Sequence, residues 1–112
     1  MLDKCGLDNP NKSLGILRAC HNGKLFTKGS PWNAEIVDCL KPKISDFVIQ
    51  NKTGLDGFVG TELQQQLERR GIETIIVGGF LTNCCVESTM RTGYEKGYNV
   101  ITLSDGSACT SH

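Results

Sequence analysis

The sequence predicts an α/β domain in which a mostly parallel open sheet lies between two layers of helices, giving three α/β/α layers. Short β-branched and aromatic runs at residues 46–50, 74–77 and 99–103 are typical of strands. Amphipathic stretches separate these runs, so the expected order is strand, helix, strand, helix, strand. Because the connections are short, right-handed crossovers between parallel neighbouring strands are the expected topology.

The N-terminal part of the chain carries weaker signals. Residues 1–29 are rich in Gly, Asn and Lys and poor in apolar periodicity, so we expect an irregular segment there. A first helix is expected to begin at Ser30, because Pro31 then occupies the first helical position, and to end before Pro42. The folded domain is therefore expected to span residues 30–112.

A helix is also expected between the first two strands. Thr61 and Gln64 have the spacing of a capping box, in which each side chain bonds the backbone of the other residue. Leu63 and Leu67 lie one turn apart on one face, and Gly71 is expected to end the helix.

The run at residues 74–77 is apolar without a break, which is typical of a strand covered on both faces. We therefore expect Ile75, Ile76 and Val77 to be buried in the central strand of three.

Two adjacent cysteines, Cys84 and Cys85, follow this strand at the start of a helix expected over residues 85–96 and ended by Gly97. The first turn of a helix has unpaired N–H groups, and the helix dipole favours an anion there. A thiolate in such a place has a lowered pKa and is a nucleophile at neutral pH. The alternative is a small buried apolar residue, and these signals barely separate the two cysteines.

Lys52 directly follows the first predicted strand, so it is expected at the same carboxyl-end rim of the sheet as Cys85. Open α/β sheets bind their ligands at this rim. A lysine there can stabilise a thiolate and handle its proton. The alternative is an exposed lysine without a chemical role.

Composition excludes several function classes. The chain has 12 basic and 12 acidic residues in a length of 112, so its formal net charge is zero. A net charge of zero does not attract nucleic acid or an anionic membrane. No run approaches the roughly 20 apolar residues of a membrane span, and no signal-peptide core is present. We therefore expect a cytoplasmic protein with six reduced cysteines. Cysteine and histidine spacing predicts no metal, and no P-loop or dinucleotide fingerprint predicts a cofactor.

Residues 78–91, with the sequence GGFLTNCCVESTMR, resemble the turn that carries the nucleophile in the isochorismatase-like cysteine hydrolase family. Upstream, residues 52–63 resemble the family's lysine loop and the helix that follows it. The 33-residue step from Lys52 to Cys85 suits the branch of ureidoacrylate amidohydrolases. The resemblance covers about residues 28–110 and implies the isochorismatase-like fold.

The resemblance also implies a mechanism, in which an Asp–Lys–Cys triad hydrolyses a small amide or ureide through an acyl-enzyme. By position it makes Cys85 the nucleophile and Lys52 the triad lysine. It implies an oxyanion hole formed by the backbone N–H groups of Leu81 and Cys85, and a cis peptide bond between Phe80 and Leu81. No metal ligands of the nicotinamidase branch are present. We also expect the protein to form a homo-oligomer.

Two departures from the family pattern affect these expectations. No segment matches the family's aspartate, because Asp3 and Asp8 have no apolar strand before them. The chain also stops at His112, before the family's last helix and strand. We therefore expect a partial hydrolase domain with at most weak amide or ureide hydrolysis, and Asp56 is the first candidate for a substitute carboxylate.

Two other functions compete with this interpretation. One is a non-catalytic remnant of the fold with a structural or oligomerisation role. The other is a thiol redox module using Cys84 and Cys85, which the lack of a C-x-x-C spacing disfavours.

Overall fold

The computed structural model describes residues 35–110. The chain divides into two compact units, residues 1–54 and 55–112, and each is described by itself. The expected irregular segment over residues 1–29 and the expected helix start at Ser30 and Pro31 lie outside the described residues.

The described part of the first unit contains one short helix, the 3-10 helix η2 (Asp38–Leu40). The predicted helix is therefore wrong over residues 35–37, which are not helical. Its expected apolar face is not buried, since Val37 is 60% exposed and Leu40 is 72% exposed. A short helix depends on burying an apolar face, because its own backbone hydrogen bonds do not offset the cost of nucleation.

The strand predicted at residues 46–50 is also wrong, because none of these residues is in a strand. Phe47 and Val48 are exposed, at 46% and 44%. β-branched and aromatic residues favour a strand mainly through packing against cross-strand neighbours. The described residues of this unit contain no strand that could pair with the run.

The second unit contains the sheet and the longer helices. Its elements in chain order are α3 (Leu63–Arg69), β1 (Thr74–Phe80), the π-helical turn η3 (Thr82–Val86), α4 (Glu87–Glu95) and β2 (Asn99–Ala108). β1 and β2 pair in parallel, which confirms that the predicted strands at 74–77 and 99–103 are neighbours. Both strands are longer than predicted. Among the described residues the sheet has these two strands and not the three expected.

The start of α3 differs from the predicted capping box. The Thr61 hydroxyl accepts the Leu63 N–H at 3.3 Å, whereas a capping box would need the Gln64 N–H. The N-cap of the helix is Glu62, which makes no side-chain cap bond. The Gln64 side chain donates to Glu68 at 2.7 Å on the exposed face of the helix, so the predicted capping box is wrong.

Both helices of the second unit end at the glycines predicted to end them. Gly71 after α3 has φ 62° and Gly97 after α4 has φ 89°, a left-handed conformation that favours glycine. After α3, the Ile72 N–H donates to the Leu67 carbonyl at 3.0 Å, which closes the helix end in a Schellman motif.

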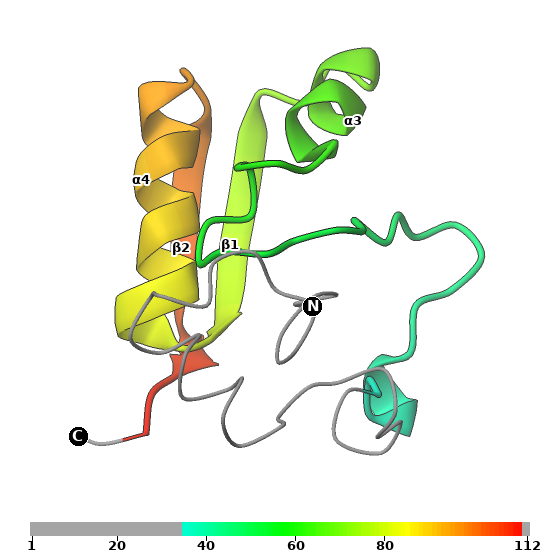
Figure 1. The fold of residues 1–112 in the computed structure, drawn as a ribbon, viewed down its shortest axis with the longest axis vertical. Coiled ribbons are helices and arrows are strands. Elements are labelled where there is room, and N and C mark those ends of the chain that lie inside the picture. Colours follow the sequence, from blue (N-terminus) through cyan, green and yellow to red (C-terminus); the bar gives the residue numbers. More distant parts are fainter. Residues whose placement is uncertain (1–34, 111–112) are drawn as a thin grey trace. The chain divides into compact units, whose positions relative to one another are not determined.

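Helix α4 packs on one face of the sheet through Gly93, and Figure 1 shows it running alongside both strands. A Cβ atom at Gly93 would lie 2.8 Å from Ile75 Cδ1, 3.4 Å from Val100 Cγ2 and 3.5 Å from Phe58 Cε2. The helix therefore contacts β1, β2 and the Phe58 loop at one point. Phe58 itself is 5% exposed and stacks on Tyr98, with ring centroids 5.9 Å apart.

The face of the sheet away from α4 is uncovered by the described residues. Ile76 in β1 is 64% exposed and Ile101, its partner in β2, is 52% exposed. Ile75 and Val77 are half-buried. The prediction of a central strand buried on both faces is therefore wrong here, because the described residues supply a helical layer on one face alone. The result is an incomplete α/β fold.

We expect Gly93→Val to lower the free energy of unfolding by about 1–3 kcal/mol, since branched methyl groups would overpack the contact with Ile75 and Val100. Urea unfolding followed by circular dichroism measures this change. Tyr94→Val is the matched control, because the neighbouring side chain is 73% exposed and the change in helix propensity is tested without overpacking. Equal unfolding midpoints for the two variants would contradict this packing.

Candidate functional site

The two cysteines lie in a short turn that joins β1 to α4. We call residues 81–86 the cysteine turn. The peptide bond between Phe80 and Leu81, at the end of β1, is cis. The Leu81 carbonyl accepts hydrogen bonds from the N–H groups of Cys84 at 3.1 Å and Val86 at 3.2 Å. These two bonds to one oxygen hold the turn together. A π-helical turn at the start of an α-helix is a feature often found at functional sites.

The structure places Cys84 and Cys85 differently from the predicted helix start. Both lie in the π-helical turn η3, and α4 begins two residues later, at Glu87. Both cysteines are half-buried, so burial does not distinguish them. The Cys84 thiol does have a partner, because its Sγ donates to Asn83 Oδ1 at 3.8 Å.

The cysteine turn has donors and charges that bear on an anion. Leu81 has extended backbone, and no backbone carbonyl within residues 55–110 accepts its N–H. Glu87 in the first turn of α4 would repel an anion, but it is paired with Arg91 at 2.8 Å. The pair leaves the local charge balanced, so the unpaired N–H group and the helix start are the polar features that favour an anion.

Lys52, the predicted triad lysine, belongs to the first unit. It is half-buried, and its Nζ donates to the Gly54 carbonyl at 2.5 Å. Cys85 belongs to the second unit. Because the two residues belong to different units, the proximity of Lys52 to Cys85 stays a prediction.

The loop that follows Lys52 in the sequence is held on α4 by two threonines. The Thr92 hydroxyl donates to Asp56 Oδ2, and the Gly57 N–H donates to Thr89 Oγ1 at 2.9 Å. Asp56 Oδ1 also accepts the Phe58 N–H at 2.7 Å. Because both carboxylate oxygens have partners, the geometry gives Asp56 a structural role.

Thr89 and Thr92 are not among the site residues predicted from the sequence. They lie three residues apart, so they share one face of α4, and both are half-buried. Two hydroxyl residues at this spacing on the inward face of a helix were the available signal.

A bulge in β2 lies beside the two glycines of the GGF sequence. Between the pairs Val77–Thr102 and Gly79–Ser107, β1 advances by two residues and β2 by five. A Cβ atom at Gly78 would lie 2.9 Å from the Gly106 carbonyl, so only glycine fits there. Bulges often occur beside active sites, where they re-aim the chain.

Ser107 is a further residue that was not predicted from the sequence. Its hydroxyl is buried and has no hydrogen-bond partner among the described residues. It is in register with Gly79, two residues before the cysteine turn. Leaving such a hydroxyl unpaired costs about 1–3 kcal/mol, so its place near the turn marks it as a residue to test.

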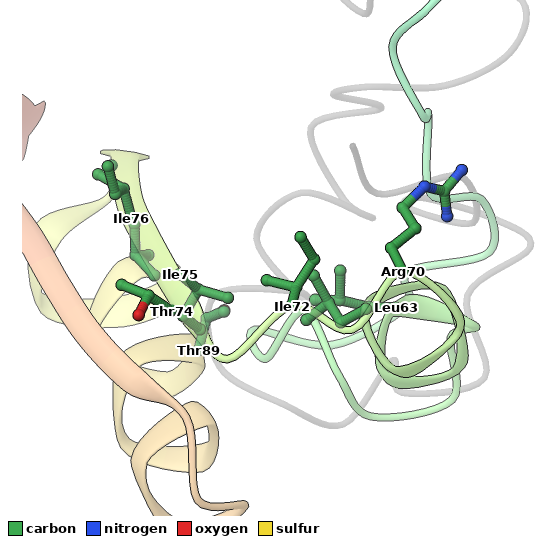
Figure 2. A pocket seen from close by; sticks show the side chains of 10 residues that line it. Leu63, Arg70, Ile72, Thr74, Ile75, Ile76 and Thr89 are labelled. Atoms are coloured by element: carbon green, nitrogen blue, oxygen red, sulfur yellow. The ribbon is translucent and has the colours of Figure 1, made fainter.

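An open apolar groove of about 530 Å³ lies between α3 and β1. Figure 2 shows Leu63 and Ile72 on one side of the groove, with Ile75 and Ile76 on the strand side. No residue of the cysteine turn lines it. The groove is therefore separate from the candidate active site.

Residues 35–110 contain no group of three or more His, Cys, Asp or Glu side chains arranged to hold a metal ion. Over the same part of the chain, no helix has both the length and the apolar character needed to cross a bilayer.

Comparison with known proteins identifies the family. The sequence profile of the isochorismatase domain matches residues 15–112, which is most of the chain. The chain belongs to the isochorismatase family. Among curated isochorismatase-family relatives, the ureidoacrylate amidohydrolase RutB of Methylorubrum extorquens is 43% identical over 89 residues, covering 80% of this chain and 35% of that protein. The chain thus spans about a third of the length of the curated relatives it matches.

Solved structures of the isochorismatase family have the same fold. A cysteine hydrolase from Pseudomonas syringae superposes with a TM-score of 0.80 at 30% identity, over 97% of this chain and 51% of that one. An N-carbamoylsarcosine amidase from Thermoplasma acidophilum superposes with a TM-score of 0.77 at 28% identity, over 94% of this chain and 56% of that one. These likenesses confirm the predicted isochorismatase-like α/β fold.

We expect Thr92→Val to lower the free energy of unfolding by about 1–3 kcal/mol, because it leaves the Asp56 carboxylate without one of its donors. Thermal unfolding measures the change, and Thr102→Val at an exposed strand position is the control.

Asp56→Asn should leave unchanged the rate at which iodoacetamide alkylates the cysteines of the cysteine turn. Loss of that rate in Asp56→Asn would show that Asp56 takes part in the chemistry.

Proposed function

We propose that this chain carries the nucleophile centre of a cysteine hydrolase that acts on a small amide or ureide. The observation that carries the proposal is the cysteine turn itself. It follows the carboxyl end of a parallel strand and contains both cysteines and Leu81, whose N–H has no backbone acceptor within residues 55–110. Strand ends of this kind are where open α/β sheets bind ligands.

The proposed reaction begins with attack of the Cys85 thiolate on the carbonyl carbon of the substrate. The carbonyl electron pair moves to oxygen, and the N–H groups of Leu81 and Cys85 donate to that oxyanion. Collapse of the intermediate breaks the C–N bond and releases the amine, which takes up a proton. Water then attacks the thioester, which releases the acid and restores the thiol. Lys52 is proposed to stabilise the thiolate and to handle its proton.

Cys85 is the better nucleophile candidate of the two cysteines. The Cys84 thiol already donates to Asn83 Oδ1. The family resemblance assigns the role to the cysteine directly before Val86 and Glu87. Both arguments favour Cys85.

The names of the relatives favour a substrate class. One relative is a ureidoacrylate amidohydrolase and one structural neighbour is an N-carbamoylsarcosine amidase. Both names describe an amide of the urea type, so a ureide or carbamoyl compound is the proposed substrate. A cytoplasmic location and a homo-oligomer stay predictions. Because the triad aspartate has no match, turnover by the 112-residue chain is expected to be weak.

Alkylation by iodoacetamide at neutral pH tests the nucleophile without requiring turnover. We expect Cys84→Ser to keep the fast-reacting thiol and Cys85→Ser to lose it, because the thiolate is the reacting species. Peptide mapping by mass spectrometry identifies the labelled position.

Cys84→Ser and Cys85→Ser make the same substitution at adjacent positions of one turn. Each variant therefore serves as the folding control for the other. Fast labelling that survives in Cys85→Ser and disappears in Cys84→Ser would reverse the assignment. Slow labelling of both cysteines would contradict an activated thiol and support the non-catalytic remnant.

A further inference from the structure

A third cysteine lies at the same rim of the sheet as the cysteine turn. Phe80, the last residue of β1, is in register with Ala108, the last residue of β2. The next residues are Leu81 in one chain segment and Cys109 in the other. Neighbouring strands are about 4.8 Å apart. The backbone of Cys109 therefore follows the end of β2 close to Leu81, the first residue of the cysteine turn.

The cysteine turn folds back over this point. The Cys84 N–H is 3.1 Å from the Leu81 carbonyl, and η3 contacts β2 as well as β1. Figure 1 shows the start of α4 and the end of β2 at the same end of the sheet. The parallel register thus places three cysteine residues, Cys84, Cys85 and Cys109, at the same end of the sheet.

We propose that Cys109 is the disulfide partner of Cys85 when the protein meets a hydroperoxide, so that the rim is a reversible oxidation site. The proposal rests on the proposed function, because it takes Cys85 as the reactive thiolate. The thiolate attacks the distal peroxide oxygen and the O–O bond breaks, which gives a sulfenic acid and releases, after proton uptake, an alcohol from an organic hydroperoxide or water from hydrogen peroxide. The Cys109 thiol then attacks that sulfur, the S–S bond forms and water leaves.

Cys109 suits this role better than Cys84 does. A disulfide needs Cα atoms about 4.4–6.8 Å apart and a dihedral angle near 90°, which adjacent residues satisfy poorly. Cys109 is exposed and lies just beyond the end of β2, in a segment without regular structure. Because it follows the last paired residue, a bond to Cys85 would not require β1 and β2 to separate.

The bond would protect the nucleophile. A sulfenic acid that finds no thiol is oxidised further to sulfinic acid, which does not return to the thiol with ordinary reductants. A disulfide with Cys109 instead restores both thiols on reduction. Peroxide would then abolish the reactivity of the Cys85 thiol, and a dithiol would restore it.

The test treats the full chain with hydrogen peroxide and maps its cysteines by non-reducing peptide mass spectrometry. The expected result is a Cys85–Cys109 peptide pair within one chain, loss of fast iodoacetamide labelling, and full recovery with dithiothreitol. Cys109→Ser should lose the crosslink and fail to recover, with sulfinic acid at Cys85. Cys39→Ser, which removes an exposed cysteine of the first unit, should behave as the parent chain does.

Several outcomes would overturn the proposal. A crosslink of Cys109 to Cys84, crosslinks between chains alone, or full recovery of Cys109→Ser would each exclude Cys109 as the partner of Cys85. Failure of the proposed function is seen separately, as slow alkylation of Cys85 before any peroxide is added.

Discussion

The close packing of α4 on the parallel pair β1 and β2 is the constraint on which the second unit depends. It is made possible by Gly93, where a side chain would meet Ile75, Val100 and Phe58 at once. Because the helix approaches both strands here, its first turn is fixed relative to the strand ends. The position of the cysteine turn follows from this contact and not from the sequence of the turn alone.

The two glycines of the GGF sequence are each required for a different physical reason. Gly78 faces the Gly106 carbonyl too closely for a side chain, and Gly79 has φ 120°, where side chains are strained. They bring β1 past the bulge in β2 and into register with Ser107 and Ala108. The chemistry proposed for the turn therefore depends on how two strands meet several residues earlier.

Local signals predicted the second unit well. The apolar run of β1, the β-branched run of β2 and the glycine stops after both helices are each properties of a few consecutive residues. The parallel pairing followed from the short helical connection between the strands. The pair of cysteines at the strand-to-helix junction could also be located from the sequence, although the π-helical turn moves the start of α4 to Glu87.

What the sequence could not predict depends on partners distant along the chain. Strand propensity alone does not make a strand, and the run Phe47-Val48-Ile49 forms none among the described residues. Ile76 was expected to be buried by its apolar neighbours, yet burial needs a second layer on that face. The bonds from Thr89 and Thr92 to the loop join residues more than 30 positions apart, which periodicity along the chain does not report.

The proposed function requires the cysteine turn to perform covalent chemistry on a carbonyl through Cys85. Trapping the acyl-enzyme would reveal this chemistry itself. The chain is mixed with an activated ester of a carbamoyl or short acyl group, quenched in acid, and analysed by intact mass and peptide fragmentation. We expect one added acyl group per chain, on Cys85 Sγ, which is absent in Cys85→Ser. An acyl group on Cys84, or none while the substrate is still consumed, would contradict it.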